Sequence, residues 1–253
     1  MIPLYDDNPT FLKPYVTVGL IAACILAYFW QSTIGWGSPD LTAYRLGFTP
    51  AALFAPASAS PEQLIVPPWL TVFTAMFLHG DLFHLGGNML FLWVFGNNVE
   101  DAMGHLRFLA FYLICGLAAA ASQGIADPDS TIPMIGASGA VSGTLGAYLL
   151  LHPRAKVIAV IPLAFIFIPV RLGAIWILSF WIVLQLTFAF LTDPAAPGVA
   201  WWAHVAGFFA GCFLILFMRR PGVNLWSGVD AVPAGPLSRS AMRRGLIKPK
   251  TDK

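Results

Sequence analysis

The sequence predicts an all-α membrane protein, a bundle of six transmembrane helices. The first observation is composition: of 253 residues, 58% are hydrophobic and only 10% are charged, whereas roughly 25% of the residues of a soluble domain are charged. The second is distribution, because the apolar residues fall into blocks separated by short polar stretches. Most blocks approach the roughly 20 residues that cross the hydrocarbon layer. A water-soluble protein is therefore excluded.

The six segments cover residues 15–35, 82–98, 106–125, 137–152, 171–192 and 200–219. The first follows no basic region and precedes no small-residue cleavage site, so it is expected to remain as an anchor. The fourth is Gly-rich and too short to cross the layer alone. Its start is expected within the membrane, at the floor of a water-filled cavity.

Between the first two segments, residues 36–81 are too rich in proline and polar residues to cross a membrane. Large apolar side chains still occur there, namely Leu46, Phe48, Leu53, Phe54, Trp69, Phe73 and Phe77. This mixture predicts a first external loop that is half inserted into the membrane interface.

Charge placement predicts that both ends of the chain are cytoplasmic. With six crossings, that side receives Lys13, Arg107, Arg154, Lys156, Arg171, Arg219 and Arg220, and Arg45 remains outside. Positive residues favour the cytoplasmic side. The expected organisation is a cytoplasmic N-terminus (1–14), a six-helix membrane domain (15–220) and a basic, disordered cytoplasmic tail (221–253).

Ser138 is the first candidate for chemistry. It lies between Gly136 and Gly139, where glycine permits a sharp turn and the start of a helix offers free amides. A nucleophile that also stabilises an oxyanion requires such surroundings. The same small residues also fit plain close packing between helices, so the residue types alone leave both roles open.

His204 lies near the outer end of the sixth segment, at a depth similar to that of Ser138. Gly207 and Gly211 are four apart on its helix, as Gly139 and Gly143 are on the other. Paired glycines allow two backbones to approach closely, so the serine hydroxyl can reach the imidazole and form a Ser-His dyad. Alternatively, His204 only packs between helices or joins them by hydrogen bonds.

His84 and Asn88 are four residues apart and share a helix face at the outer end of the second segment. Two donors there can point at an oxyanion beside Ser138. His79 precedes that helix and is expected to hold the external loop by hydrogen bonds. A metal site of His79, His84 and His204 is the competing interpretation, but no nearby carboxylate or cysteine completes a zinc set.

Two negative observations complete the candidate site. Ser142 follows Ser138 by one helical turn, and a serine inside a helix usually bonds back to a carbonyl. No acidic residue occurs in an apolar block near the candidate pair, so a Ser-His-Asp triad is not expected. Cys24, Cys115 and Cys212 are spread through apolar blocks without disulfide or zinc spacing, and are expected to be small core residues.

These residues together resemble the rhomboid family of intramembrane proteases. The resemblance is carried by GASG around Ser138, AHVAGFFAG around His204 and FLHGDLFHLGGNMLFLWVFG, which contains His79, His84 and Asn88. All three occur in the family's order, and the six segments cover nearly the whole chain. The resemblance implies that Ser138 cleaves peptide bonds in transmembrane substrates and that His204 transfers the proton. It further implies an oxyanion hole formed by His84, Asn88 and the Ser138 amide.

The resemblance implies neither a metal nor an organic cofactor. The expected partners are transmembrane protein substrates and the lipid bilayer, and no nucleic acid is expected. Two positions depart from the family pattern. Trp69 is followed by Leu70 where many relatives carry arginine, and Ser142 replaces a tyrosine that stacks on the catalytic histidine in several relatives. The second departure predicts a less firmly held imidazole.

Two other functions are alternatives to a protease. A catalytically silent relative that binds membrane clients is expected to lack Ser138 or His204, and both are present. A small transporter is expected to show inverted repeats or a carboxylate at depth, and neither is found. The short N-terminus without a targeting segment favours the bacterial inner membrane. The sequence names neither the substrate nor the oligomeric state.

Overall fold

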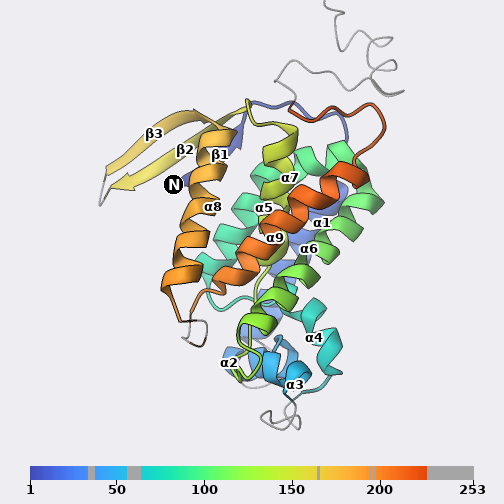
Figure 1. Cartoon of the computed structure of the whole chain (residues 1–253), viewed down its shortest axis with the longest axis vertical. Coiled ribbons are helices and arrows are strands. Elements are labelled where there is room, and N and C mark those ends of the chain that lie inside the picture. Colours follow the sequence, from blue (N-terminus) through green and yellow to red (C-terminus); the bar gives the residue numbers. More distant parts are fainter. Residues whose placement is uncertain (34–37, 56–63, 164–165, 194, 196–197, 227–253) are drawn as a thin grey trace, which may run out of the picture.

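The computed structural model describes residues 1–33, 38–55, 64–163, 166–193, 195 and 198–226. A helix occupies most of each predicted segment, and together these helices form one bundle (Figure 1). They are α1 (Tyr15–Thr33), α5 (Leu82–Met103), α6 (His105–Ala126), α7 (Ser138–Leu151), α8 (Ala174–Leu191) and α9 (Trp201–Met218). Four of them, α1, α6, α8 and α9, are long and apolar enough to cross a membrane. The predicted helical membrane fold is confirmed.

Helix α7 lies at the centre of the bundle. Its 14 residues span only about 21 Å at 1.5 Å per residue, less than the roughly 30 Å hydrocarbon layer. Almost every residue from Gly139 to Tyr148 is buried, and α7 packs against α5, α6 and α9. A helix that is apolar on all sides belongs inside a bundle, so α7 is shielded by its longer neighbours.

Helices α7 and α9 approach each other closely where glycines replace side chains. A Cβ at Gly207 would collide with the carbonyl oxygen of Gly139, and one at Gly211 with that of Gly143. The two backbones therefore pack against each other without intervening side chains. This packing sets the positions of Ser138 at the start of α7 and of His204 on α9.

A buried acidic pair near the end of α5 ties both ends of the chain to the bundle. The Glu100 carboxylate accepts hydrogen bonds from the Thr17 amide (2.8 Å) and hydroxyl (2.7 Å) and lies 2.5 Å from His105 Nδ1. Asp101 pairs with Arg220 at 3.1 Å and accepts from the amide of Phe11. Buried charges require such partners, and these contacts link the segments before α1 and after α9 to α5.

A small antiparallel sheet is the main departure from the predicted all-α fold. Its order is β1 (Ile2–Asp6), β2 (Lys156–Leu163) and β3 (Ile166–Gly173). Strands β2 and β3 lie largely between the fourth and fifth predicted segments, where no regular element was expected. The fifth segment therefore begins as a helix at Ala174, not at Arg171. Residues in β2 and β3 are mostly Ile, Val, Leu and Phe, types that favour strands. The sheet joins the bundle through Tyr148, whose hydroxyl donates to Asp6.

Short helices occur between α1 and α5, in the predicted external loop, here called the external segment, at the end of the bundle opposite the sheet (Figure 1). They are α2 (Pro39–Leu46), α3 (Pro50–Phe54), α4 (Pro68–Thr74) and the 3₁₀ helix η2 (Ala75–Phe77). Phe48, only 1% exposed, forms an antiparallel bridge with Met134 in the loop before α7. Trp69 is 60% exposed. Half-insertion of this segment into the interface stays a prediction.

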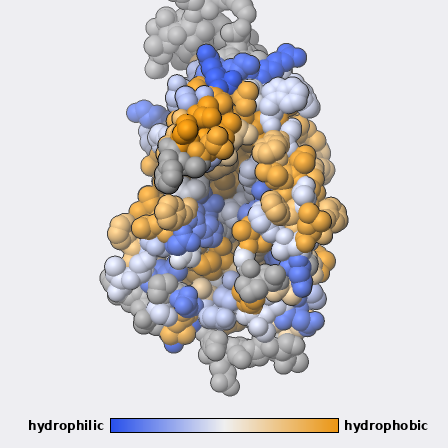
Figure 2. Space-filling model, turned by 90° about the vertical axis from the view of Figure 1, so that its left-hand side faces the viewer, coloured by the Kyte–Doolittle hydropathy of each residue, from blue (hydrophilic) through white to orange (hydrophobic). Residues whose placement is uncertain are grey.

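Apolar side chains on the outer faces of the bundle are left without protein cover. On α8 they include Trp176, Phe180, Val183, Phe190 and Leu191, and on α9 Phe209, Phe213 and Phe217. Figure 2 shows broad hydrophobic areas on the side of the molecule that carries α8, with hydrophilic residues at its upper end. A lipid environment explains this exposure.

The predicted tail falls mostly outside the described residues. Residues 221–226, assigned to that tail, turn back on the bundle, and the Trp226 amide donates to the Leu150 carbonyl (2.8 Å). Cys24 and Cys115 are buried, as expected of core residues, while Cys212 is half-buried.

Candidate active site

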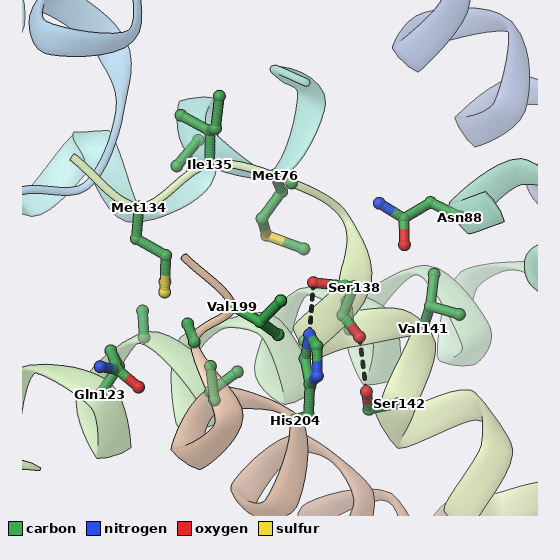
Figure 3. Close-up of a pocket in the computed structure, with 18 of the residues that line it drawn as sticks. Met76, Asn88, Gln123, Met134, Ile135, Ser138, Val141, Ser142, Val199 and His204 are labelled. Atoms are coloured by element: carbon green, nitrogen blue, oxygen red, sulfur yellow. Dashed lines mark hydrogen bonds between the residues drawn. The ribbon is translucent and has the colours of Figure 1, made fainter. Parts of the chain in front are cut away.

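A cavity of about 630 Å³ opens at the start of α7. It is lined by His84 and Asn88 of α5, by Gly136 and Ser138, and by His204 of α9. Apolar side chains complete its wall, among them Met76, Met134, Ile135, Val141 and Val199 (Figure 3). The polar residues singled out from the sequence thus converge on one apolar-walled space, as ligand and active sites commonly do.

Ser138 and His204 are in direct contact in this cavity. The serine Oγ lies 2.8 Å from the imidazole Nε2, the hydrogen bond drawn in Figure 3. This distance is the length of a normal hydrogen bond. It lets the imidazole accept the serine proton, as a general base must do for a hydroxyl nucleophile.

Gly136 shapes the turn that presents Ser138. Its φ of 121° lies in a region that L side chains rarely adopt, and a Cβ there would lie 2.7 Å from His84 Nε2. Its amide donates to the Ala75 carbonyl (2.9 Å), which joins the turn to the external segment. Glycine is therefore required both by the backbone conformation and by the histidine beside it.

The side chains of His84 and Asn88 supply hydrogen-bond donors beside this turn. The Gly80 amide donates to His84 Nδ1 (3.4 Å), so a neutral ring carries its proton on Nε2, the atom next to Gly136. The Asn88 Nδ2 atom is buried and has no partner among the described residues. Because an unpaired buried donor is costly, this amide is available to a group that enters the cavity.

The imidazole of His79 packs behind His84. The two rings meet edge to face with their centroids 5.1 Å apart, and burial lowers the pKa of His79 to about 4. The external segment is held to α1 by the His79 backbone, which exchanges hydrogen bonds with Gln31 (3.1 and 3.3 Å). The ring nitrogen Nδ1 lies 3.3 Å from the Phe77 carbonyl, so its hydrogen bond is local.

Ser142 does not face the base. Its hydroxyl donates to the Ser138 carbonyl at 2.6 Å, as predicted for a serine inside a helix (Figure 3). Since its proton is already donated to a backbone carbonyl, the Ser142 hydroxyl is a poor nucleophile.

Among the described residues, no group of three His, Cys, Asp or Glu side chains is placed to hold a metal ion.

Sequence reasoning missed the residues that hold the imidazole of His204. The Nδ1 atom lies 2.8 Å from Oε1 of Gln185 on α8, and the rings of Trp181 and Trp201 lie 6.1 and 6.2 Å from the imidazole. The expectation of a less firmly held ring was based on Ser142 alone and stays a prediction. One feature of the sequence could have indicated this partner: Gln185 is an amide within the apolar run WILSFWIVLQLTFAF. Polar side chains at membrane depth usually have a functional role.

Comparisons with known proteins agree on one family. Residues 67–221, more than half of the chain, match the family model described as Rhomboid domain. The chain is 33% identical over 137 residues to "Rhomboid protease GluP" of Bacillus subtilis (strain 168), covering 54% of this chain and 24% of that protein. It is 26% identical over 222 residues to "Presenilin-associated rhomboid-like protein, mitochondrial" of Homo sapiens, covering 82% and 51%.

A plant relative gives the same result. "RHOMBOID-like protein 5" of Arabidopsis thaliana is 33% identical over 149 residues, which cover 58% of this chain and 44% of the relative. The matched regions thus span between about a quarter and a half of the length of these relatives.

Proposed function

The chain belongs to the rhomboid family, and from this premise we propose that it is an intramembrane serine endopeptidase that cleaves transmembrane proteins. One observation carries the proposal: the contact of 2.8 Å between Ser138 Oγ and His204 Nε2 inside a cavity that also holds the unpartnered amide of Asn88. A nucleophile, a base and a free donor around one space are the minimum for acyl transfer.

In the proposed reaction, Ser138 Oγ attacks the scissile carbonyl carbon while its proton passes to His204 Nε2. The tetrahedral intermediate collapses when the imidazolium returns this proton to the leaving amine, which gives an acyl-enzyme. A water molecule, deprotonated by the same nitrogen, then attacks the acyl carbon, and the imidazolium returns this proton to Ser138 Oγ as the bond from the acyl carbon to Oγ breaks and the second product leaves. The oxygen that gains negative charge would be stabilised by His84 Nε2–H, the Asn88 amide and the Ser138 backbone N–H.

Transmembrane segments are the proposed substrates because the site lies in a membrane-embedded domain. We also propose that both termini are cytoplasmic and that the six-helix domain spans residues 15–220 of a bacterial inner-membrane protein. No cofactor is required by this mechanism. The products would leave on the outer side, which is the end of the bundle where α7 begins.

Cleavage of a model transmembrane substrate, co-expressed with the protein, tests this function. Ser138→Ala and His204→Ala should each abolish cleavage without loss of folded protein. Ser142→Ala is the matched control, because it removes a hydroxyl one turn away that is bonded to a carbonyl, and it should keep most activity. If Ser142→Ala alone were inactive, or if Ser138→Ala still cleaved, the assigned nucleophile would be wrong.

A further inference from the structure

Gln185 is a buried amide on a helix that otherwise faces lipid and the neighbouring helix. It is 7% exposed, and its Oε1 lies 2.8 Å from His204 Nδ1. We propose that Gln185 is the positioning residue of the catalytic base, a neutral third member that fixes the tautomer and the orientation of His204. This inference rests on the proposed function, since it assigns a partner to the base of that reaction.

The hydrogen-bond roles follow from the atoms involved. An amide oxygen only accepts, so His204 Nδ1 must carry the proton in this contact. A neutral imidazole with a proton on Nδ1 has its lone pair on Nε2, the atom 2.8 Å from Ser138 Oγ. The opposite tautomer would direct a proton at the serine and could not accept one. Gln185 therefore selects the tautomer that the proposed mechanism needs.

Gln185 does not itself touch the space where a substrate binds. The side chains that line the cavity include Trp181, one turn earlier on α8, but not Gln185. Its contact with His204 is on the side of the ring away from Ser138, because the two hydrogen bonds use opposite nitrogens. Loss of this residue should consequently affect catalysis rather than substrate binding.

Membrane depth explains why an amide takes this place. A carboxylate would support the imidazolium more strongly, but an ionised side chain within the hydrocarbon region is expensive to bury. An amide provides an accepting oxygen without charge. The rings of Trp181 and Trp201, tilted 35° and 88° from the imidazole plane, restrict the remaining rotation of His204.

The test compares the purified full chain with three variants in a cleavage assay with a transmembrane substrate. Gln185→Met keeps the length of the side chain but removes the acceptor, and should lower kcat by about 10-fold with KM unchanged, the effect of one neutral hydrogen bond. Gln185→Glu keeps an accepting oxygen in either protonation state and should restore most of kcat. Thr187→Val, an exposed position on the same helix, should match the intact protein.

A second measurement reads the tautomer without any turnover. In ¹⁵N-histidine NMR spectra, with His204 identified by its loss in His204→Ala, the intact protein should show a protonated Nδ1, and Gln185→Met should lose this preference. An unprotonated Nδ1 in the intact protein, or a Gln185→Met variant with unchanged kcat, would overturn the inference. An inactive but folded intact protein that still shows protonated Nδ1 would instead contradict the proposed protease function and leave the positioning role supported.

Discussion

Replacement of Gly211 by alanine tests how closely the geometry of the site depends on helix packing. The added Cβ would lie 2.5 Å from the carbonyl carbon of Gly143 and 2.6 Å from its Cα. Ordinary contacts between carbon atoms are about 3.5–4.0 Å, so α9 must move away from α7 by about 1 Å. Gly211 itself is remote from the cavity lining, which separates this effect from direct contact with substrate.

A displacement of that size is large compared with the tolerance of the site. The contact between Ser138 Oγ and His204 Nε2, now 2.8 Å, would lengthen to about 3.8 Å, beyond hydrogen-bond range. Misplacement of a catalytic group by 1 Å can lower the rate about 100-fold. Overpacking should also destabilise the fold by about 1–3 kcal/mol, or roughly 2–12 °C in Tm for a chain of this size.

The assay measures kcat and Tm in detergent for Gly211→Ala and for Gly19→Ala. Gly19 on α1 has no neighbouring atom within 4 Å of an added Cβ, so the same chemical change should leave both values near those of the intact protein. A Gly211→Ala variant with unchanged Tm and kcat would show that the glycines do not control the separation of α7 and α9.

Two further predictions concern single polar groups. Asn88→Ala should lower kcat by on the order of 100-fold to 1000-fold, with KM nearly unchanged, because it removes one oxyanion donor. Steady-state cleavage kinetics measure both constants, and a loss of kcat below about threefold would exclude Asn88 from that role. Burial raises the pKa of Asp6 from 3.8 to about 6, so the folded state binds this proton more tightly and loses stability as the pH rises from about 4 to 6. Asp6→Asn should therefore raise the free energy of unfolding relative to the intact protein at pH 8, by about 1–2 kcal/mol after allowance for partial exposure, but hardly at pH 3, where this carboxyl is mostly protonated in the unfolded state too; an equal difference at both pH values would contradict this.

The helical bundle and the residues of the candidate site could be predicted because their signals are local. Blocks of apolar residues indicate where helices can lie in a membrane, and Gly139, Gly143, Gly207 and Gly211 indicate a close helix contact from spacing alone. Polar groups such as Ser138, His204 and Asn88 are conspicuous in an apolar segment. Each of these inferences needs only the sequence within one helix.

Features that join distant parts of the chain were not predictable in this way. Strand β1 pairs with β2 more than 150 residues later, and no local pattern specifies that partner. Gln185 reaches His204 only because α8 and α9 pack side by side (Figure 1). The expectation about partners of the base concerned acidic residues alone and so did not include the amide of Gln185.

The most direct test of the central claim is covalent labelling of the folded protein in detergent micelles with a fluorophosphonate probe. We expect a phosphonylated peptide that contains Ser138, with labelling lost in both Ser138→Ala and His204→Ala. Absence of labelling in the intact, folded protein, or labelling that persists in Ser138→Ala, would contradict the claim that Ser138 is an activated nucleophile.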